Sequence, residues 1–225
     1  MMDAPRRVVV WRHGRTAWNQ QHRFQGTTDV PLDEVGLLQV ELAAGYLERL
    51  KPTTVIASDA RRTRETTAVL SARMGGCVTL DPRLREAHIG AWEGLTRAEV
   101  AHRFPDEYDA WRAGTDARRG DGETLEEVAS RAGEAVDEAL SRLLQAGTLL
   151  VVTHGGTARA LVGRLLQLPP EHWRTLGTLG HARWSVLEER QFGWRLAEHN
   201  SKAPRRRPDS APRPAAPVEI RANSI

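Results

Sequence analysis

The sequence contains a single cysteine, Cys77, among its 225 residues. One cysteine cannot form an internal disulfide, which excludes a disulfide-stapled scaffold and favours a reducing compartment, so we expect a cytoplasmic protein and a small core role for Cys77. No apolar run approaches the roughly 20 residues that a membrane span needs. The first apolar run, Val8 to Trp11, is too short for a signal-peptide core. No internal period is present, which excludes collagen, coiled coils and repeat arrays.

Lysine is almost absent. Only Lys51 and Lys202 are lysines among 32 cationic residues, a bias typical of a GC-rich genome. The formal net charge is +3, but residues 201–225 hold six cations against two acidic residues and contribute +4, so the first 200 residues carry −1. The basic excess therefore belongs to the C-terminal segment and predicts no nucleic-acid-binding domain.

The C-terminal segment also differs in composition. Residues 201–225 hold five of the twelve prolines. Such a segment cannot bury enough apolar area to offset its ordering entropy. We predict one domain over residues 1–200 and a flexible, basic, proline-rich tail over 201–225. A tether to an acidic partner is the functional alternative to a solvated tail.

The first 200 residues alternate between short apolar runs and stretches with helical spacing. Buried parallel strands are expected at 8–11, 54–57 and 149–152, and a late hairpin at 182–187 and 193–197. Helices are expected at 37–50, 63–74, 96–104 and 125–144, and another opens at Gly155. This alternation predicts an α/β fold with a mainly parallel sheet, whose ligands bind at the carboxyl ends of the strands.

Histidines and arginines follow the expected strands. Arg12 and His13 follow the first strand, Arg62 follows the second, and His154 follows the strand at 149–152. Arginine pairs with phosphoryl oxygens in fork geometry, and a neutral imidazole can attack phosphorus. Nearby arginines favour the neutral imidazole because a second cation beside them is disfavoured. The pattern therefore predicts a phosphoryl-binding site with a histidine nucleophile.

Several motifs together resemble the histidine phosphatase superfamily, in its phosphoglycerate mutase-like branch. The similarity spans most of residues 7–199 and implies a three-layer α/β/α fold with a mainly parallel sheet. The motifs that carry it are Arg12-His13-Gly14 with Thr16 and Asn19, Arg23-Phe24-Gln25-Gly26, Ser58-Asp59 with Arg62, Leu84-Arg85-Glu86, and His154-Gly155-Gly156.

The resemblance implies a role for each matching residue. His13 would be the nucleophile, and Glu86 would protonate the leaving oxygen and then activate water. Phosphate-holding residues would come from three segments, with roles for Arg12, Arg62, His154, Asn19 and the Gly155 backbone. Thr16, Gln25 and Gly26 would line the pocket beyond the phosphate. No metal and no cofactor are implied.

Two departures bear on the substrate. Arg15 stands where many members carry Glu or Gln, and residues 180–183 differ from the usual pattern. Arg15 and the pair Arg118-Arg119 could favour a second negative charge such as a carboxylate, or the pair could simply face water. Three stretches resemble actinobacterial members, glucosyl-3-phosphoglycerate phosphatases among them: the run from Leu84 to Thr96, Trp111-Arg112, and the late segment with Trp184 and Trp194-Arg195-Leu196. We therefore expect a small sugar or glycerate-type phosphomonoester.

Three functions remain open at this point. The first is a phosphatase that acts through phospho-His13, the second a cofactor-dependent phosphoglycerate mutase, and the third an inactive phosphate-binding module. The segment between Glu86 and His154 looks shorter than the corresponding mutase insert, which favours hydrolysis. The expected partners are a small phosphomonoester and, on the basis of relatives alone, a second copy of the chain. No nucleic acid and no membrane are expected.

Overall fold

The computed structural model describes residues 5–143 and 146–203, which form one sheet with the strand order β3-β2-β4-β1-β5-β6. The strands are β1 (Arg7–Arg12), β2 (Thr54–Ala57), β3 (Thr79–Leu80), β4 (Thr148–Thr153), β5 (Trp184–Arg190) and β6 (Gly193–Ser201). Strands β1 to β4 pair in parallel, whereas β5 runs antiparallel to β1 and β6 antiparallel to β5. The expected α/β fold with a mainly parallel sheet is confirmed.

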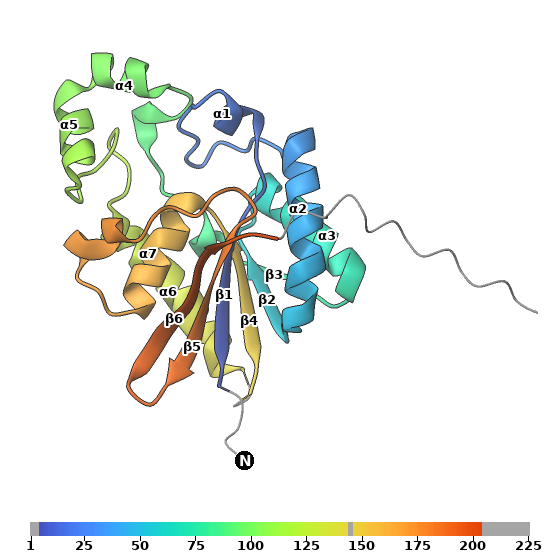
Figure 1. Cartoon of the computed structure of the whole chain (residues 1–225). Coiled ribbons are helices and arrows are strands. Elements are labelled where there is room, and N and C mark those ends of the chain that lie inside the picture. Colours follow the sequence, from blue (N-terminus) through green and yellow to red (C-terminus); the bar gives the residue numbers. More distant parts are fainter. Residues whose placement is uncertain (1–4, 144–145, 204–225) are drawn as a thin grey trace, which may run out of the picture.

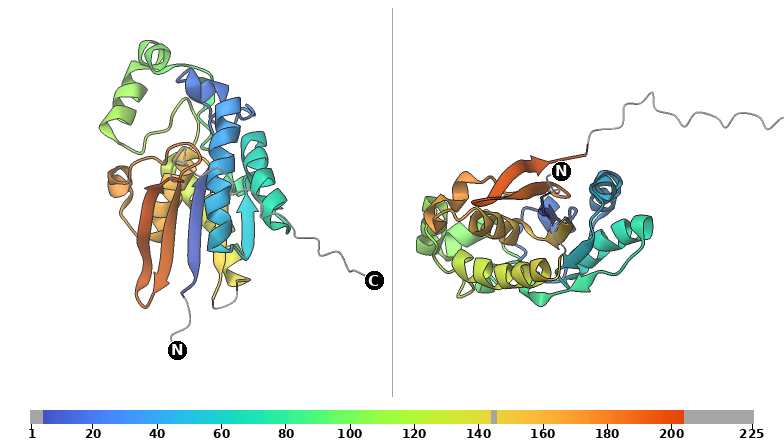
Figure 2. Two further views of the ribbon diagram at one scale, coloured as in Figure 1. Left: turned by 45° about the vertical axis from the view of Figure 1, so that its right-hand side comes forward. Right: turned by 90° about the horizontal axis from the view of Figure 1, so that it is seen from below.

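The two central strands are apolar along nearly their whole length because helices cover both faces. Val8 and Val10 of β1 pack with α6 (Leu125–Ser141) and α7 (Gly155–Leu165). Val9 and Trp11, which point to the opposite face, pack with α2 (Glu34–Leu47). Helix α3 (Arg61–Met74) adds to the second layer through Leu70. Figure 1 and the view from below in Figure 2 show the sheet between these two helical layers.

Capping side chains fix the N-termini of α6 and α2. Thr124 is the N-cap of α6: its hydroxyl accepts from the Glu127 N–H, and the Glu127 carboxylate accepts from the Thr124 N–H. This reciprocal pair satisfies two backbone donors that the helix itself cannot. Asp33 caps α2 in a similar way by accepting from the Gly36 N–H.

A cap lies above the carboxyl ends of the parallel strands (Figure 1). It contains α4 (Arg97–Arg103) and α5 (Pro105–Ala113), near the short α1 (Ala17–Gln20). An aromatic cluster holds it together: the Phe24 ring lies 5.2 Å from Trp92 and 5.5 Å from Trp111, centroid to centroid. The cap thus forms a separate apolar centre that covers the strand ends.

The sequence predicted most elements, and it predicted the limits of three strands closely. The strands at 8–11, 54–57 and 149–152 are confirmed to within one residue at each end, and residues 190–193 form the expected hairpin between β5 and β6. The two-residue strand β3 and helix α5 were not predicted. Cys77, expected in the core, is exposed instead, because it lies in the loop between α3 and β3.

Two further expectations concern the ends of the described chain. Strand β6 continues through Ser201, and Ala203 packs against the α2 side of the sheet. The rest of the expected tail, residues 204–225, lies outside the described residues. In the described part of the chain, no helix combines the length and apolarity required to cross a membrane.

Candidate active site

A cavity of about 380 Å³ opens at the carboxyl ends of β1 and β4, beneath the cap. It brings together eight of the residues singled out from the sequence: Arg12, His13, Asn19, Gln25, Gly26, Arg62, Glu86 and Gly155. The segments that carry them are far apart in the sequence, and parallel strand ends place them at one edge of the sheet.

His13 follows β1 directly and is 3% exposed. Its Nδ1 donates to the Gly14 carbonyl oxygen at 2.6 Å, and since a carbonyl can only accept, the proton of the neutral ring lies on Nδ1. The lone pair is then on Nε2. Burial, and then the positive charges of Arg62 and Arg12, hold the pKa of His13 well below its usual range. His13 is therefore a neutral imidazole with a nucleophilic Nε2.

His154 follows β4 and is fully buried, with its ring centroid 5.2 Å from that of His13. Its Nδ1 accepts from Arg62 Nε at 3.1 Å, so its proton lies on Nε2, which donates to the Ser58 hydroxyl at 2.9 Å. Burial first, and then the charge of Arg62, hold the pKa of His154 well below its usual range. Both ring nitrogens are engaged with protein groups, and His154 is not among the residues that line the cavity.

The two arginines beside the histidines are held by backbone carbonyls. Arg62 is 1% exposed and donates to the carbonyls of Thr28 and Gly26, each at 2.8 Å. Arg12 donates to the Leu179 carbonyl at 2.6 Å and to His181 Nε2 at 3.1 Å, while its buried Nε has no partner in the described part of the chain. Burial lowers the pKa of each arginine to about 10, so both guanidiniums stay charged at neutral pH.

Glu86 lies at the N-terminus of α7. Its carboxylate accepts from the Gly156 N–H at 2.9 Å and from the Thr157 N–H at 3.0 Å. Burial raises the pKa of Glu86, but the backbone N–H groups of Gly156 and Ala87 and the charges of Arg119 and Arg12 outweigh it, and the pKa is lowered overall. In the free protein, the carboxyl is ionised at neutral pH.

A polar network joins α1 to the cavity wall. Thr16, expected to line the pocket, is fully buried and caps α1, and its hydroxyl donates to Gln25 Oε1 at 3.2 Å. Asn19 Nδ2 donates to the same oxygen at 3.4 Å. This leaves Gln25 Nε2 as a buried donor without a partner in the described residues. Thr16 therefore positions Gln25 instead of facing the ligand.

Arg15, Arg118 and Arg119, which the sequence offered as partners for a second negative charge on the substrate, have different surroundings in the structure. Arg15 pairs with Asp33 at 2.8 Å, and Arg118 pairs with Glu127 at 2.5 Å. Arg119 instead lines the cavity, as does Arg159 of α7, which the sequence analysis missed. The signal for Arg159 was its place four residues after Gly155, one helical turn along the same face. His181, beside Arg12, was noted only as a departure from the family pattern.

Comparison with known proteins agrees with this geometry. A family model described as the histidine phosphatase superfamily (branch 1) matches residues 8–202. A glucosyl-3-phosphoglycerate phosphatase of Mycobacterium tuberculosis is 35% identical over 213 residues, covering 88% of this chain and 96% of that protein. The structure of a mycobacterial glucosyl-3-phosphoglycerate phosphatase with VO3 matches with a TM-score of 0.83 at 36% identity, covering 88% of this chain and 100% of that chain.

The chain is also similar to a protein named as a mutase. A protein of Yersinia pestis named probable phosphoglycerate mutase GpmB is 36% identical over 193 residues, covering 83% of this chain and 86% of that protein. The chain belongs to the histidine phosphatase superfamily. Within it, the chain is an enzyme of the phosphatase type, a phosphomonoester hydrolase.

Proposed function

We propose that the protein hydrolyses a small sugar or glycerate-type phosphomonoester by transferring its phosphoryl group to Nε2 of His13. The observation that carries the proposal is the state of His13: a buried, neutral imidazole whose Nδ1–H is held by Gly14, between two charged arginines. A nucleophile needs a free lone pair, and a phosphoryl group needs cations at its oxygens. The cavity supplies both.

In the first step, Nε2 of His13 attacks phosphorus and the bond from phosphorus to the ester oxygen breaks. Arg12, Arg62, Asn19 and the backbone at Gly155 hold the phosphoryl oxygens. The buried Arg12 Nε, which has no protein partner among the described residues, is available to an oxygen of the phosphoryl group. His154 contributes by holding Arg62 in place through its Nδ1.

The leaving oxygen takes a proton that Glu86 delivers. Because the pKa of Glu86 is lowered in the free protein, its proton must arrive with the substrate: a bound dianion raises the carboxyl pKa, and a monoanionic ester carries a proton itself. In the second step, Glu86 accepts a proton from water, the water oxygen bonds to phosphorus, and the bond to Nε2 breaks. Phosphate leaves and His13 is restored.

The charges of the arginines take the place that a metal ion has in other phosphoryl-transfer sites, so we propose a metal-independent reaction. Gln25 and Gly26 line the part of the cavity beyond the phosphoryl group. The similar mycobacterial phosphatase named for glucosyl-3-phosphoglycerate supports a glycerate-type substrate. The reducing compartment inferred from one cysteine supports a cytoplasmic enzyme, and a homodimer stays a prediction that light scattering would check.

A mutase is the second candidate, and the relative named probable phosphoglycerate mutase GpmB favours it. A mutase would return the phosphoryl group from His13 to a phosphoglycerate instead of to water. Both functions would use the same residues to form phospho-His13. They differ in the molecule that then accepts the phosphoryl group, which is water for a phosphatase and a phosphoglycerate for a mutase.

The test measures phosphate release from p-nitrophenyl phosphate, glucosyl-3-phosphoglycerate, 3-phosphoglycerate, α-ribazole phosphate and a hexose phosphate, with excess chelator. A parallel assay follows 2-phosphoglycerate formation in the presence of 2,3-bisphosphoglycerate. We expect chelator-resistant hydrolysis that is lost in His13→Ala and retained in His172→Ala, whose exposed side chain lies outside the cavity. Interconversion of phosphoglycerates without net phosphate release would establish the mutase instead.

A further inference from the structure

The direction of the Arg12 guanidinium is set by an irregular segment, residues 176–183, which leads from the short 3-10 helix Pro170–Thr175 into β5. The Leu179 carbonyl accepts from Arg12 Nη1 at 2.6 Å, and His181 Nε2 accepts from Arg12 Nη2 at 3.1 Å. Because the segment is neither helix nor strand, its own backbone does not fix these two acceptors. The position of Arg12 therefore depends on what holds the segment.

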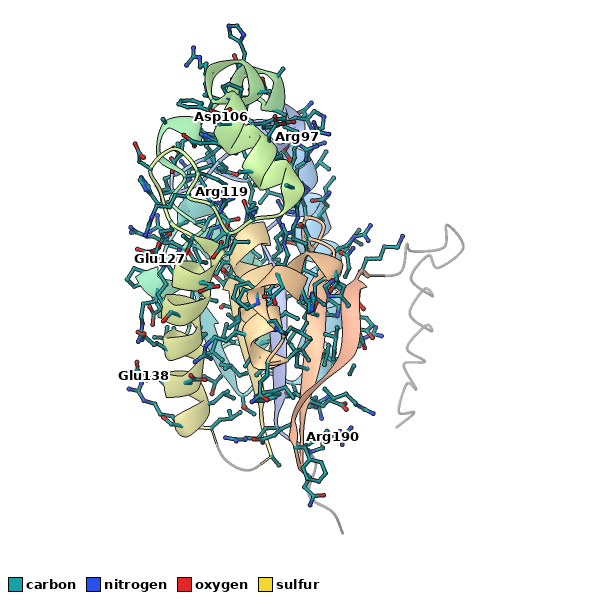
Figure 3. The ribbon with its side chains drawn as sticks, turned by 90° about the vertical axis from the view of Figure 1, so that its left-hand side faces the viewer. Arg97, Asp106, Arg119, Glu127, Glu138 and Arg190 are labelled. Atoms are coloured by element: carbon teal, nitrogen blue, oxygen red, sulfur yellow. The ribbon has the colours of Figure 1, made fainter. Side chains whose placement is uncertain are left out.

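Strand β6 ends at the same end of the sheet as the site. It runs antiparallel to β5, which runs antiparallel to β1, so β6 and β1 point the same way. In Figure 3 the hairpin turn near Arg190 lies at the bottom, and the cap, marked by Arg97 and Asp106, lies at the opposite end of the molecule. The last residues of β6 therefore lie on the cap side of the sheet, within reach of residues 176–183.

One peptide unit of the segment is held by Arg12 on one side and by β6 on the other. Its oxygen is the Leu179 carbonyl, and its N–H is that of Gly180, which donates to Asn200 Oδ1 at 2.9 Å. In a planar trans peptide the C=O and the N–H point in opposite directions and can only turn together. Asn200 thus fixes the direction in which the Leu179 carbonyl faces Arg12. Hydrogen bonds in series also polarise one another, which strengthens the contact with the guanidinium.

The preceding residue of β6 anchors the start of the same segment. His199 Nε2 donates to the Gly177 carbonyl at 2.9 Å, and since a carbonyl can only accept, His199 Nδ1 accepts from the Ser185 hydroxyl at 2.9 Å. Ser185 is fully buried on β5, so the imidazole joins the segment to the sheet. The segment is held at Gly177 and at Gly180, on both sides of Thr178, which lines the cavity.

An irregularity in β6 allows two adjacent side chains to reach the same segment. Consecutive residues of a regular strand point to opposite faces of the sheet. Trp184 pairs with Ser201 and Val186 with Glu198, so β6 advances three residues where β5 advances two. Such a bulge redirects side chains, and Asn200 within it has φ +53°, a left-handed conformation that asparagine tolerates better than most residues.

We propose that Asn200 is a positioning residue of the phosphoryl site, which sets the Arg12 guanidinium through the peptide unit that follows Leu179. His199 assists it by holding the start of the segment. Both side chains lie outside the lining of the cavity, so they act on the substrate only through Arg12. The inference rests on the proposed function, which assigns the phosphoryl oxygens to Arg12.

Two substitutions at position 200 separate the acceptor oxygen from the backbone conformation. Asn200→Gly removes the acceptor and keeps the positive φ accessible, whereas Asn200→Asp keeps an acceptor for the Gly180 N–H. Glu198→Gly is the matched control, because it places a glycine two residues earlier in β6, outside the cavity lining. For each variant, kcat/KM is measured with p-nitrophenyl phosphate and Kd with inorganic phosphate. Asn200→Gly is also combined with Arg12→Met, which removes the guanidinium.

We expect Asn200→Gly to lower kcat/KM about 5- to 50-fold, since a misplacement of about 1 Å in a group that holds the reactant can cost up to about 100-fold. Asn200→Asp and Glu198→Gly should stay within about threefold of the wild type. In the Arg12→Met background, Asn200→Gly should cost about threefold or less, because the group that it positions is gone. Equal losses in the two backgrounds, or a loss no larger than that of Glu198→Gly, would overturn the positioning role.

Failure of the proposed function gives a different result: the wild type would hydrolyse no phosphomonoester at all. Calorimetric titration with phosphate then decides the inference. A Kd that rises in Asn200→Gly but not on its addition to Arg12→Met supports it, and an unchanged Kd, or a wild type that binds no phosphate, overturns it. Thermal unfolding shows whether each variant is folded. If Asn200→Gly is not, His199→Phe, which removes the other anchor, takes its place in the same comparison.

Discussion

Acid should destabilise this protein over a pH range in which its carboxylates are still ionised. Three histidines at the site, His13, His154 and His181, have pKa values lowered by burial and by neighbouring arginines, and that of His181 falls to about 3. Their ordinary value is 6.5. Between the folded and the unfolded pKa, the unfolded chain binds protons that the folded protein does not, so stability falls as the pH falls.

The size of the effect follows from the depth of these shifts. At pH 5.5, one unit below the ordinary histidine pKa of 6.5, the unfolded chain gains a proton that the folded protein does not. Each histidine held neutral in the fold therefore lowers the free energy of unfolding by about 1.4 kcal/mol relative to pH 7.5. Three such residues cost about 4 kcal/mol, a large part of the ~5–15 kcal/mol that stabilises a typical domain. Acidic side chains contribute little here because their ordinary pKa values lie about a unit or more lower.

Urea unfolding at pH 7.5 and 5.5 measures the loss directly, in buffers without phosphate or sulfate, because an anion bound at the site would add stability. His181→Gln should reduce the loss to about 2.7 kcal/mol, since one titrating group is gone while the amide oxygen can still accept from Arg12. Between pH 7.5 and 8.5, where the histidines are neutral in both states, little change is expected. A fall of less than about 1.5 kcal/mol by pH 5.5 would refute the inference that these rings are held neutral.

Three further predictions concern single residues. Glu86→Gln should lower kcat about 10²- to 10⁴-fold for glycerol 3-phosphate and less for p-nitrophenyl phosphate, whose leaving group needs no proton; equal losses would contradict the acid role. Gly26→Ala should destabilise the protein by about 1–3 kcal/mol, because Gly26 has φ +53° and an added Cβ would lie 2.2 Å from Glu93 Oε1. Urea unfolding measures this loss, and an unchanged midpoint would show that the loop relaxes freely. Thr124→Ala should cost ~1 kcal/mol through loss of the α6 cap, with Thr124→Ser restoring most of it and activity unaffected.

Features written locally in the sequence were predicted well. The buried strands appear as continuous apolar runs because helices cover both of their faces, so their position needs no knowledge of distant residues. The residues in the loops and first turns that follow these strands, such as His13 and Arg62, follow from the rule that ligands bind at strand ends. Strand β3 was missed because it is two exposed residues long, and its pairing with β2 depends on the finished sheet.

Features that depend on side-chain direction could not be predicted. Arg118 and Arg119 are adjacent and chemically identical, yet one pairs with Glu127 and the other lines the cavity. The loop conformation that separates them depends on Gly120, whose φ is +54° and whose N–H donates to Glu107 of α5 at 2.7 Å. Arg159 lies one helical turn after Gly155, but its reaching the same cavity as Arg119 could not be predicted, because that depends on how α7 lies beneath the cap.

Burial connects the reactivity of this site with its instability. Burial and the neighbouring arginines hold the pKa of His13 well below its usual range, so the ring is neutral at neutral pH and Nε2 stays available for attack. The same exclusion of water strengthens every contact between an arginine and a phosphoryl oxygen. It also leaves arginines such as Arg119 and Arg159 with donors that the protein does not satisfy. The empty protein should therefore be the least stable form, and an anion that engages Arg119 or Arg159 as well as the His13 end of the cavity should raise its melting temperature more than phosphate does at the same free concentration, because it binds more tightly. A smaller rise with 3-phosphoglycerate than with phosphate, at equal free concentration, would show that these two arginines gain nothing from the second anion.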